Sequence, residues 1–348
     1  MLRARHEVVT ALLGAALVAC DGPVASMTDA GAGVDAASAR DAAIDAPRSE
    51  LDAALAPGWR SEPDVPVAIQ EIAGAVLEGD LVIAGGLDAA AAVVRSVRRY
   101  DVDGGGGWSS LPDLPEARHH LMLVALGGDL YALGGMQTLR FEPLDTAWVL
   151  RAGASEWTDI APLPDSRAAG VAGAIDGRIV IGSGQSERGL VTAALIYDPA
   201  MDAWSTSAAS LPTPREHTAG FVHDGELYVV AGRMFAIGSN EALVHAFDPA
   251  LDAWRAVPPT MVPRGGHGVA LLDGRAYAVG GETMERALDS VEVLDLADPT
   301  AWAASTPVPT RRHGHVVLAA GGRIWVIGGA TVPSLGADAT MESFAPPP

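Results

Sequence analysis

Residues 167–184, with the sequence RAAGVAGAIDGRIVIGSG, contain the pattern that decides the fold. An apolar run at 171–175 ends at Asp176-Gly177, and a second apolar run at 179–181 leads to Ser183-Gly184. Asp-Gly supplies the positive φ values that a two-residue hairpin turn requires. The stretch therefore predicts two antiparallel strands joined by a tight turn. Related turns occur at 224–225, 273–274 and 321–322, which indicates that the hairpin is repeated.

The last glycine of this stretch belongs to an internal repeat. It recurs, 48 or 49 residues apart, at Gly86, Gly135, Gly184, Gly232, Gly281 and Gly329. Tryptophan follows the same period at Trp59, Trp108, Trp157, Trp204, Trp254 and Trp302. An arginine stands 17 residues before the glycine at Arg118, Arg167, Arg215, Arg264 and Arg312, whereas the first repeat has Ile69. A fixed period of this length marks one supersecondary unit. We expect the repeat arginines to hydrogen-bond between strands.

Each repeat predicts a four-stranded antiparallel sheet, because a third strand ends at Tyr197 and, after a turn at Asp198-Pro199, a fourth carries Trp204. An apolar strand that ends in Gly-Gly, followed by an aromatic residue, Trp and a Pro-x-x-Arg-like segment, resembles the kelch repeat. The glycine pair is weakened to Ser183-Gly184 and Ala231-Gly232 in two repeats. The resemblance covers residues 57–348 and implies an all-β fold, a six-bladed β-propeller of four-stranded antiparallel blades.

The ends of the repeat array suggest how the ring closes. The sequence stops at Pro348, before a fourth strand could follow Phe344, and Trp59 precedes every other strand. We therefore expect the segment around Trp59 to supply the outer strand of the last blade. Such closure removes open sheet edges, which otherwise pair with other chains.

Residues 1–20 resemble the signal peptide of a bacterial lipoprotein. Arg3 and Arg5 precede an apolar run at 8–18, which is too short to span a bilayer, and the run leads to Leu17-Val18-Ala19-Cys20. We expect Cys20, the single cysteine, to carry lipid that anchors the protein to the inner or outer membrane of the cell envelope. An ordinary signal peptide with an incidental cysteine is the alternative.

The remaining composition sets the domain organisation and the class of partner. Residues 21–56 are mostly Ala, Asp, Gly and Ser, and they predict a disordered tether before a propeller at 57–348. The net charge is −20, and all 23 basic residues are arginines. Such an acidic surface repels a phosphate backbone, so we expect no nucleic-acid partner.

Histidines cluster near the repeat arginines, close to where kelch propellers have one mouth of their central channel. By the kelch pattern, His267 and His315 are expected to pack between blades. The others stay open between packing and ligand binding. The candidate ligand-binding mouth comprises His119, His120, Gln185, Arg188, Glu216, His217, Arg233, Glu282, Arg286 and His313. We assign no catalytic residue, metal ion or cofactor.

These features lead to one preferred function and two alternatives. The preferred function is a monomeric, lipid-anchored, non-catalytic module that binds a protein or a glycan at the propeller mouth. One alternative is a carbohydrate-active enzyme, because some kelch propellers act on sugars, among them galactose oxidase and bacterial sialic acid mutarotases. The oxidase is disfavoured because its cofactor needs a cysteine-linked tyrosine, and this domain has no cysteine. The other alternative is an envelope scaffold with a sealed mouth.

Overall fold

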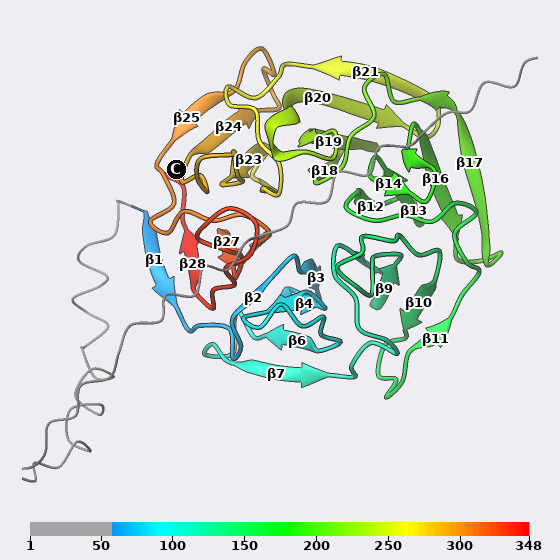
Figure 1. Cartoon of the computed structure of the whole chain (residues 1–348), viewed down its shortest axis with the longest axis horizontal. Helices are drawn as coiled ribbons and strands as arrows, with labels where there is room; N and C mark the ends of the chain where they lie inside the picture. The colour runs from blue at the N-terminus through cyan, green and yellow to red at the C-terminus, as the bar shows by residue number, and fades with distance from the viewer. Residues whose placement is uncertain (1–57, 348) are drawn as a thin grey trace, which may run out of the picture. The chain divides into compact units, whose positions relative to one another are not determined.

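Six four-stranded antiparallel sheets form a ring in the part of the chain that the computed structural model describes, residues 58–347 (Figure 1). The predicted signal peptide, Cys20 and the tether at 21–56 lie outside the described residues. Blade 1 has β3 (Ala73–Leu77), β4 (Asp80–Ala84), β6 (Val97–Tyr100) and β7 (Trp108–Leu111). Blade 2 has β8 (Met122–Leu126), β9 (Asp129–Leu133), β10 (Ala147–Leu150) and β11 (Thr158–Asp159). Blade 3 has β12 (Val171–Ile175), β13 (Arg178–Gly182), β16 (Ala193–Asp198) and β17 (Ala203–Ser210).

The second half of the ring repeats this order. Blade 4 has β18 (Ala219–His223), β19 (Glu226–Arg233), β20 (Asn240–Asp248) and β21 (Ala253–Val257). Blade 5 has β22 (Gly268–Leu272), β23 (Arg275–Val279), β24 (Val291–Asp295) and β25 (Ala303–Ser305). Blade 6 has β26 (Val316–Ala320), β27 (Arg323–Ile327), β28 (Met341–Phe344) and β1 (Trp59–Glu62). Two short ribbons pair β2 (Ile69–Gln70) with β5 (Leu87–Asp88) and β14 (Gln185–Ser186) with β15 (Gly189–Leu190).

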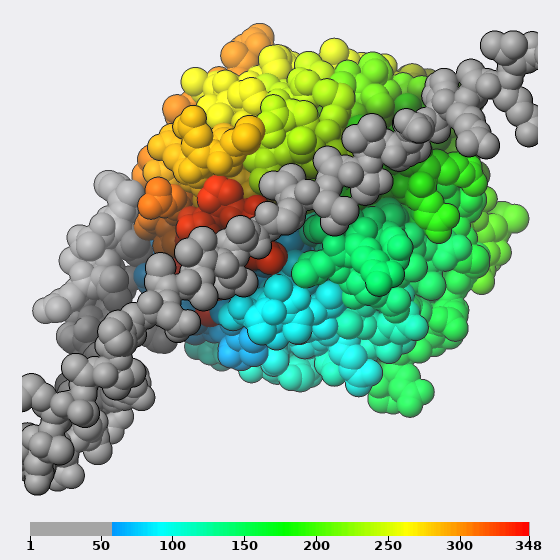
Figure 2. All heavy atoms as spheres, viewed as in Figure 1, coloured from blue at the N-terminus to red at the C-terminus, as the bar shows by residue number. Residues whose placement is uncertain are grey.

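The first strand of each blade faces the centre of the ring. These inner strands contact one another in the order β3, β8, β12, β18, β22 and β26, and β26 contacts β3 again. Figure 2 shows the blades as successive coloured sectors of the same ring. The predicted tight turn is confirmed, because Ile175 pairs with Arg178 across Asp176 and Gly177, whose φ values are 48° and 76°.

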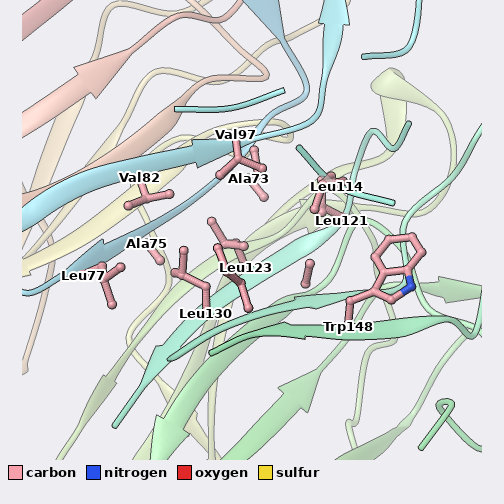
Figure 3. Close-up of a cluster of buried hydrophobic side chains, with 13 residues drawn as sticks. Ala73, Ala75, Leu77, Val82, Val97, Leu114, Leu121, Leu123, Leu130 and Trp148 are labelled. Atoms are coloured by element: carbon pink, nitrogen blue, oxygen red, sulfur yellow. The ribbon is translucent and has the colours of Figure 1, made fainter. Parts of the chain in front are cut away.

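Apolar side chains fill the layers between neighbouring blades. Figure 3 shows the layer in which Leu77 and Val82 of blade 1 pack near Leu123 and Leu130 of blade 2, with Trp148 at one end. Because neighbouring blades cover both faces of a central strand, strands such as β9 are buried at four consecutive positions. No helix within residues 58–347 is long and apolar enough to cross a membrane.

The predicted closure of the ring through Trp59 is confirmed. Strand β1 pairs antiparallel with β28, with Trp59 opposite Phe344, and the centroids of the two rings lie 5.1 Å apart with their planes tilted by 33°. The indole N–H of Trp59 donates to the carbonyl of Thr306 in blade 5. Repeat tryptophans elsewhere bridge blades in the same way, as Trp157 does to Pro112 and Trp302 to Pro258. Trp59 therefore does in blade 6 what its counterparts do in other blades.

Candidate functional site

The repeat arginines of blades 2–6 form hydrogen bonds that link strands, as expected. Each of the five is at most 1% exposed. The guanidinium of Arg312 donates to the carbonyls of Gly328 at 2.9 Å and Thr340 at 2.8 Å, and it pairs with Glu342 at 2.6 Å. Regular positions of this kind build the scaffold, so a functional site must use residues that differ between blades.

Two residues beyond each repeat arginine, and beyond Ile69 in blade 1, the backbone passes close to the axis of the ring. We call these six residues the axial positions, and their φ values lie between 49° and 63°. Five backbone hydrogen bonds run between axial positions of neighbouring blades, for example from the N–H of His120 to the carbonyl of Glu71. The axial residues are Glu71, His120, Ala169, His217, Gly266 and Gly314.

Three axial residues are small, and the other three carry long polar side chains into the space that the small ones leave. A Cβ at Gly314 would lie 2.6 Å from Oε1 of Glu71, so this glycine makes room for the carboxylate. A left-handed conformation costs a non-glycine residue about 1–2 kcal/mol. Such strain persists where the surroundings enforce it, often at functional sites.

The three polar axial residues, Glu71, His120 and His217, form a cluster that we call the axial triad. Nε2 of His120 lies 3.1 Å from Oε2 of Glu71 and 2.9 Å from Nε2 of His217. The triad lines a cavity of about 230 Å³ that runs between the inner strands. A cavity of this volume has room for several water molecules.

Two neighbouring residues orient the imidazoles of the triad. Nδ1 of His120 lies 2.6 Å from Nδ1 of His119, whose Nε2 is 3.1 Å from the carbonyl oxygen of Thr138. Nδ1 of His217 contacts the carboxylate of Glu216. Burial, with repulsion from His120, lowers the pKa of His119 to about 4. Burial also lowers the pKa of His217, against the opposing effect of the Glu216 carboxylate.

An arginine and two glutamates flank the triad. Arg233 donates to Glu216 at 3.0 Å and to Glu282 at 2.6 Å, and its third nitrogen lies 2.8 Å from Nε2 of His217. His313 lies 3.6 Å from both Glu71 and Glu282. Burial opposes the charge of Arg233, but Glu216 and Glu282 raise its pKa. The result is a densely charged centre at one end of the ring.

The charge of Glu71 is also maintained in this centre. Burial by itself raises the pKa of a carboxyl group, but the charges and hydrogen bonds of His120 and His313 hold the pKa of Glu71 well below its usual value. In turn, Glu71 and Glu282 outweigh the effect of burial on His313 and raise its pKa. Glu71 is therefore an ionised carboxylate next to basic nitrogens.

The structure brings seven of the ten candidate mouth residues together around the triad. They are His119, His120, Glu216, His217, Arg233, Glu282 and His313. Gln185 is buried in β14 opposite Leu190, and Arg188 and Arg286 are exposed on the loops after β14 and β23. Within residues 58–347, neither of these arginines joins the ion pairs of the centre.

Sequence reasoning missed Glu71. The arginine pattern fails at Ile69 in blade 1, so the pattern gives no landmark that points to Glu71. Counting two residues onward from each repeat arginine, and from Ile69, would have identified the whole triad. His267 and His315 are buried, as expected for packing residues, and Nε2 of His315 lies 3.2 Å from the carbonyl of Val279.

Exposed apolar side chains surround the charged centre. They lie on the loops that follow the glycine pairs of blades 2, 4, 5 and 6, and their exposures range from 41% to 75%. Phe141 contacts the triad, with its ring centroid 6.2 Å from that of His120. We call this set the apolar rim: Leu139, Phe141, Met234, Phe235, Met284, Val332 and Leu335.

Comparisons with known proteins agree on the fold. The family model described as the KLHDC2/KLHL20/DRC7 Kelch-repeats domain matches residues 71–281. The structure titled "Structure of YjhT" superposes with a TM-score of 0.69 at 15% identity, over 80% of this chain and 95% of that chain. At this identity the similarity concerns the fold alone.

Curated relatives are similar over shorter segments. Kelch-like protein 36 of Bos taurus is 28% identical over 123 residues, which is 35% of this chain and 20% of that protein. Alpha-scruin of Limulus polyphemus is 29% identical over 133 residues, which is 36% of this chain and 14% of that protein. The chain thus matches a fifth or less of the length of these relatives.

Proposed function

Because this chain belongs to the kelch-repeat family, we propose that it is a binding module that captures a segment of a partner protein at the mouth of the ring. The kelch propeller is commonly a protein-binding module. The observation that carries the proposal is the apolar rim, seven large apolar side chains that are at least 41% exposed around one end of the channel. Exposed apolar groups gathered on one face mark interaction sites.

The composition of the rim suits a protein ligand. Phe141, Phe235 and Met284 belong to the residue types that are enriched in protein interfaces, and they can become anchors when a partner excludes water from them. The net charge of the chain is −20, which favours a partner of opposite charge during encounter. We therefore expect an extended loop with apolar side chains and flanking basic residues.

The proposal includes a location. The sequence around Cys20 supports lipid attachment, which would hold the ring at a membrane surface of the cell envelope. Expression of the full chain with a radiolabelled fatty acid tests this part. Label is expected on the wild-type chain and not on Cys20→Ser. Label retained after this substitution, or absent from both chains, contradicts lipidation.

The test of the binding face compares a triple variant in the rim with a double control variant. Both replace exposed apolar residues by serine. The rim variant combines Phe141→Ser, Phe235→Ser and Met284→Ser. The control combines Met201→Ser and Leu251→Ser, whose side chains are each 75% exposed. The control residues lie in turns between the third and fourth strands, and the antiparallel order of the blades puts those turns at the opposite face of the ring.

We expect cross-linking in envelope preparations to identify a partner that the wild type and the control retain and the rim variant loses. The melting temperatures of all three proteins should agree within about 2 °C, because surface substitutions usually change stability by less than about 0.5 kcal/mol. A partner that the rim variant retains, or that both variants lose equally, refutes the rim as the binding face.

A second candidate function is acid–base chemistry on a sugar, favoured by the titratable groups Glu71, His120 and His217 at the cavity. NMR exchange spectroscopy of anomeric protons would detect accelerated mutarotation. An acceleration that Glu71→Gln abolishes supports this function, and an unchanged rate with neutral and acidic sugars rejects it.

A further inference from the structure

We propose that Glu71, His120 and His217 form a binding site for a divalent transition-metal ion, with zinc as the reference ion, on the axis of the ring. The three candidate ligand atoms come from blades 1, 2 and 4 and lie within 4.8 Å of one another. The small residues Ala169, Gly266 and Gly314 occupy the remaining axial positions. Only half of the axial positions carry side chains that can bind a metal, and those three converge.

Hydrogen bonds fix the tautomer of His120. A carbonyl oxygen only accepts, so the contact with Thr138 requires a proton on Nε2 of His119. Nδ1 of neutral His119 is then an acceptor, and His120 must donate to it from its own Nδ1. In neutral His120 this leaves the lone pair of Nε2 directed at Glu71 and His217.

The tautomer of His217 is fixed in the same sense. The carboxylate of Glu216 accepts the proton of Nδ1, so Nε2 of neutral His217 also carries a lone pair. Carboxylate–histidine pairs of this kind orient metal-binding imidazoles in known sites. Nε2 of His120, Nε2 of His217 and a carboxylate oxygen of Glu71 are therefore three acceptor atoms close to one another. Arg233 donates to Nε2 of His217, and a metal ion bound by all three atoms would relieve the acceptor–acceptor contacts of His120 with Glu71 and His217.

The spacing of these atoms suits a metal ion. Ligands 2.0–2.1 Å from a tetrahedral zinc ion stand about 3.3 Å apart. In the structure, Nε2 of His120 is 3.1 Å from Glu71 and 2.9 Å from His217, so ligation requires shifts of only a few tenths of an ångström for these pairs. A fourth position can face the cavity that the triad lines.

Arg233 is the competing cation. Its guanidinium donates to Nε2 of His217 at 2.8 Å, and it is also held by Glu216 and Glu282. Metal ligation must break the first of these bonds and can leave the other two in place. Arg233→Gln removes this competitor, and we expect it to strengthen metal binding, opposite in direction to loss of a ligand.

The test uses the full chain in detergent with Cys20→Ser, so that the single thiol binds no metal. Zinc is titrated by calorimetry after EDTA treatment, and cobalt is followed by its visible absorption. We expect one equivalent to bind. Glu71→Gln, His120→Ala and His217→Ala should each weaken binding by more than about 100-fold, and Glu216→Gln by about 10–100-fold. His245→Gln, a buried histidine outside the axis, is the control and should bind like the parent protein.

Two results would overturn the metal site. The first is that the parent chain takes up neither zinc nor cobalt, which would mean that a proton alone bridges the triad. The second is an unchanged metal affinity in the His120→Ala and His217→Ala variants. Circular dichroism of each metal-free variant shows whether it is folded. If the alanine variants are unfolded, the test rests on Glu71→Gln, which is nearly isosteric with the parent residue. A double variant with Phe235→Ser and Met284→Ser leaves Phe141 in place against His120 and should bind metal normally, so failure of the docking proposal and failure of the metal site are separate outcomes.

Discussion

Replacing Trp59 by alanine removes the central contact that closes the ring. Trp59 is 5% exposed, its ring packs against that of Phe344 with centroids 5.1 Å apart, and its indole N–H donates to the carbonyl of Thr306. It packs in the apolar layer between blades 5 and 6, together with Val279 and Val308. The substitution therefore weakens the contact of β1 with both its own blade and the preceding one.

The expected loss follows from this burial. Large-to-small substitution of a buried aromatic residue costs about 3–5 kcal/mol. A cooperative unit of about 290 residues has an unfolding entropy of about 0.6 kcal/mol/K, so the melting temperature should fall by about 5–8 °C. Differential scanning calorimetry at neutral pH measures this shift.

Two controls separate closure from general packing. Trp59→Phe keeps a ring against Phe344 but loses the indole hydrogen bond, which should cost about 1 kcal/mol, and part of the buried ring, so its total loss should be smaller than that of Trp59→Ala. Deleting residues 58–60 should cost more than Trp59→Ala and promote association, because β28 becomes an open edge. If Trp59→Ala, or the deletion, left the melting temperature unchanged, β1 would not close the ring.

Three further outcomes are expected. Arg312→Met leaves Glu342 buried without its partner and should cost about 3–5 kcal/mol in urea unfolding, whereas adding Glu342→Gln should recover part of the loss. Gly314→Ala puts a Cβ 2.6 Å from Oε1 of Glu71 and forces alanine to a φ of 60°, so zinc affinity and stability should both fall. The third concerns pH. Burial lowers the pKa of His315 to about 3, so below about pH 6.5 the unfolded chain binds a proton that the folded chain does not, and stability falls as the pH drops. His315→Gln should reduce the slope of stability against pH, between pH 6 and 4, by about 1.4 kcal/mol per unit, and an unchanged slope would contradict a neutral His315.

Most of the fold follows from sequence because its determinants are local and repeated. Asp176-Gly177 specifies a tight turn by backbone conformation alone, and the constant distance from arginine to glycine fixes the same strand order in every blade. Ring closure was predictable because Trp59 precedes every other strand, so the fourth strand that it marks has no other strands of a blade before it, whereas the last repeat lacks a fourth strand. Blades that repeat with one geometry leave few other ways to bury their faces.

The site was only partly predictable. Histidines next to the repeat arginines indicated the correct end of the ring, but the convergence of Glu71 with His120 and His217 depends on a left-handed backbone at each axial position. The glycine period does not encode that conformation at non-glycine residues. The sequence places Arg188 and Arg286 on loops at the mouth. In the described part of the chain, both side chains are exposed and neither joins the ion pairs of the centre.

The most direct test of the axial site is anomalous diffraction at the zinc absorption edge from crystals of the zinc-loaded protein. One peak is expected on the axis, about 2.0–2.2 Å from Nε2 of His120, Nε2 of His217 and a carboxylate oxygen of Glu71, with Arg233 withdrawn from His217. An axis without an anomalous peak, with Arg233 still bonded to His217, would contradict it.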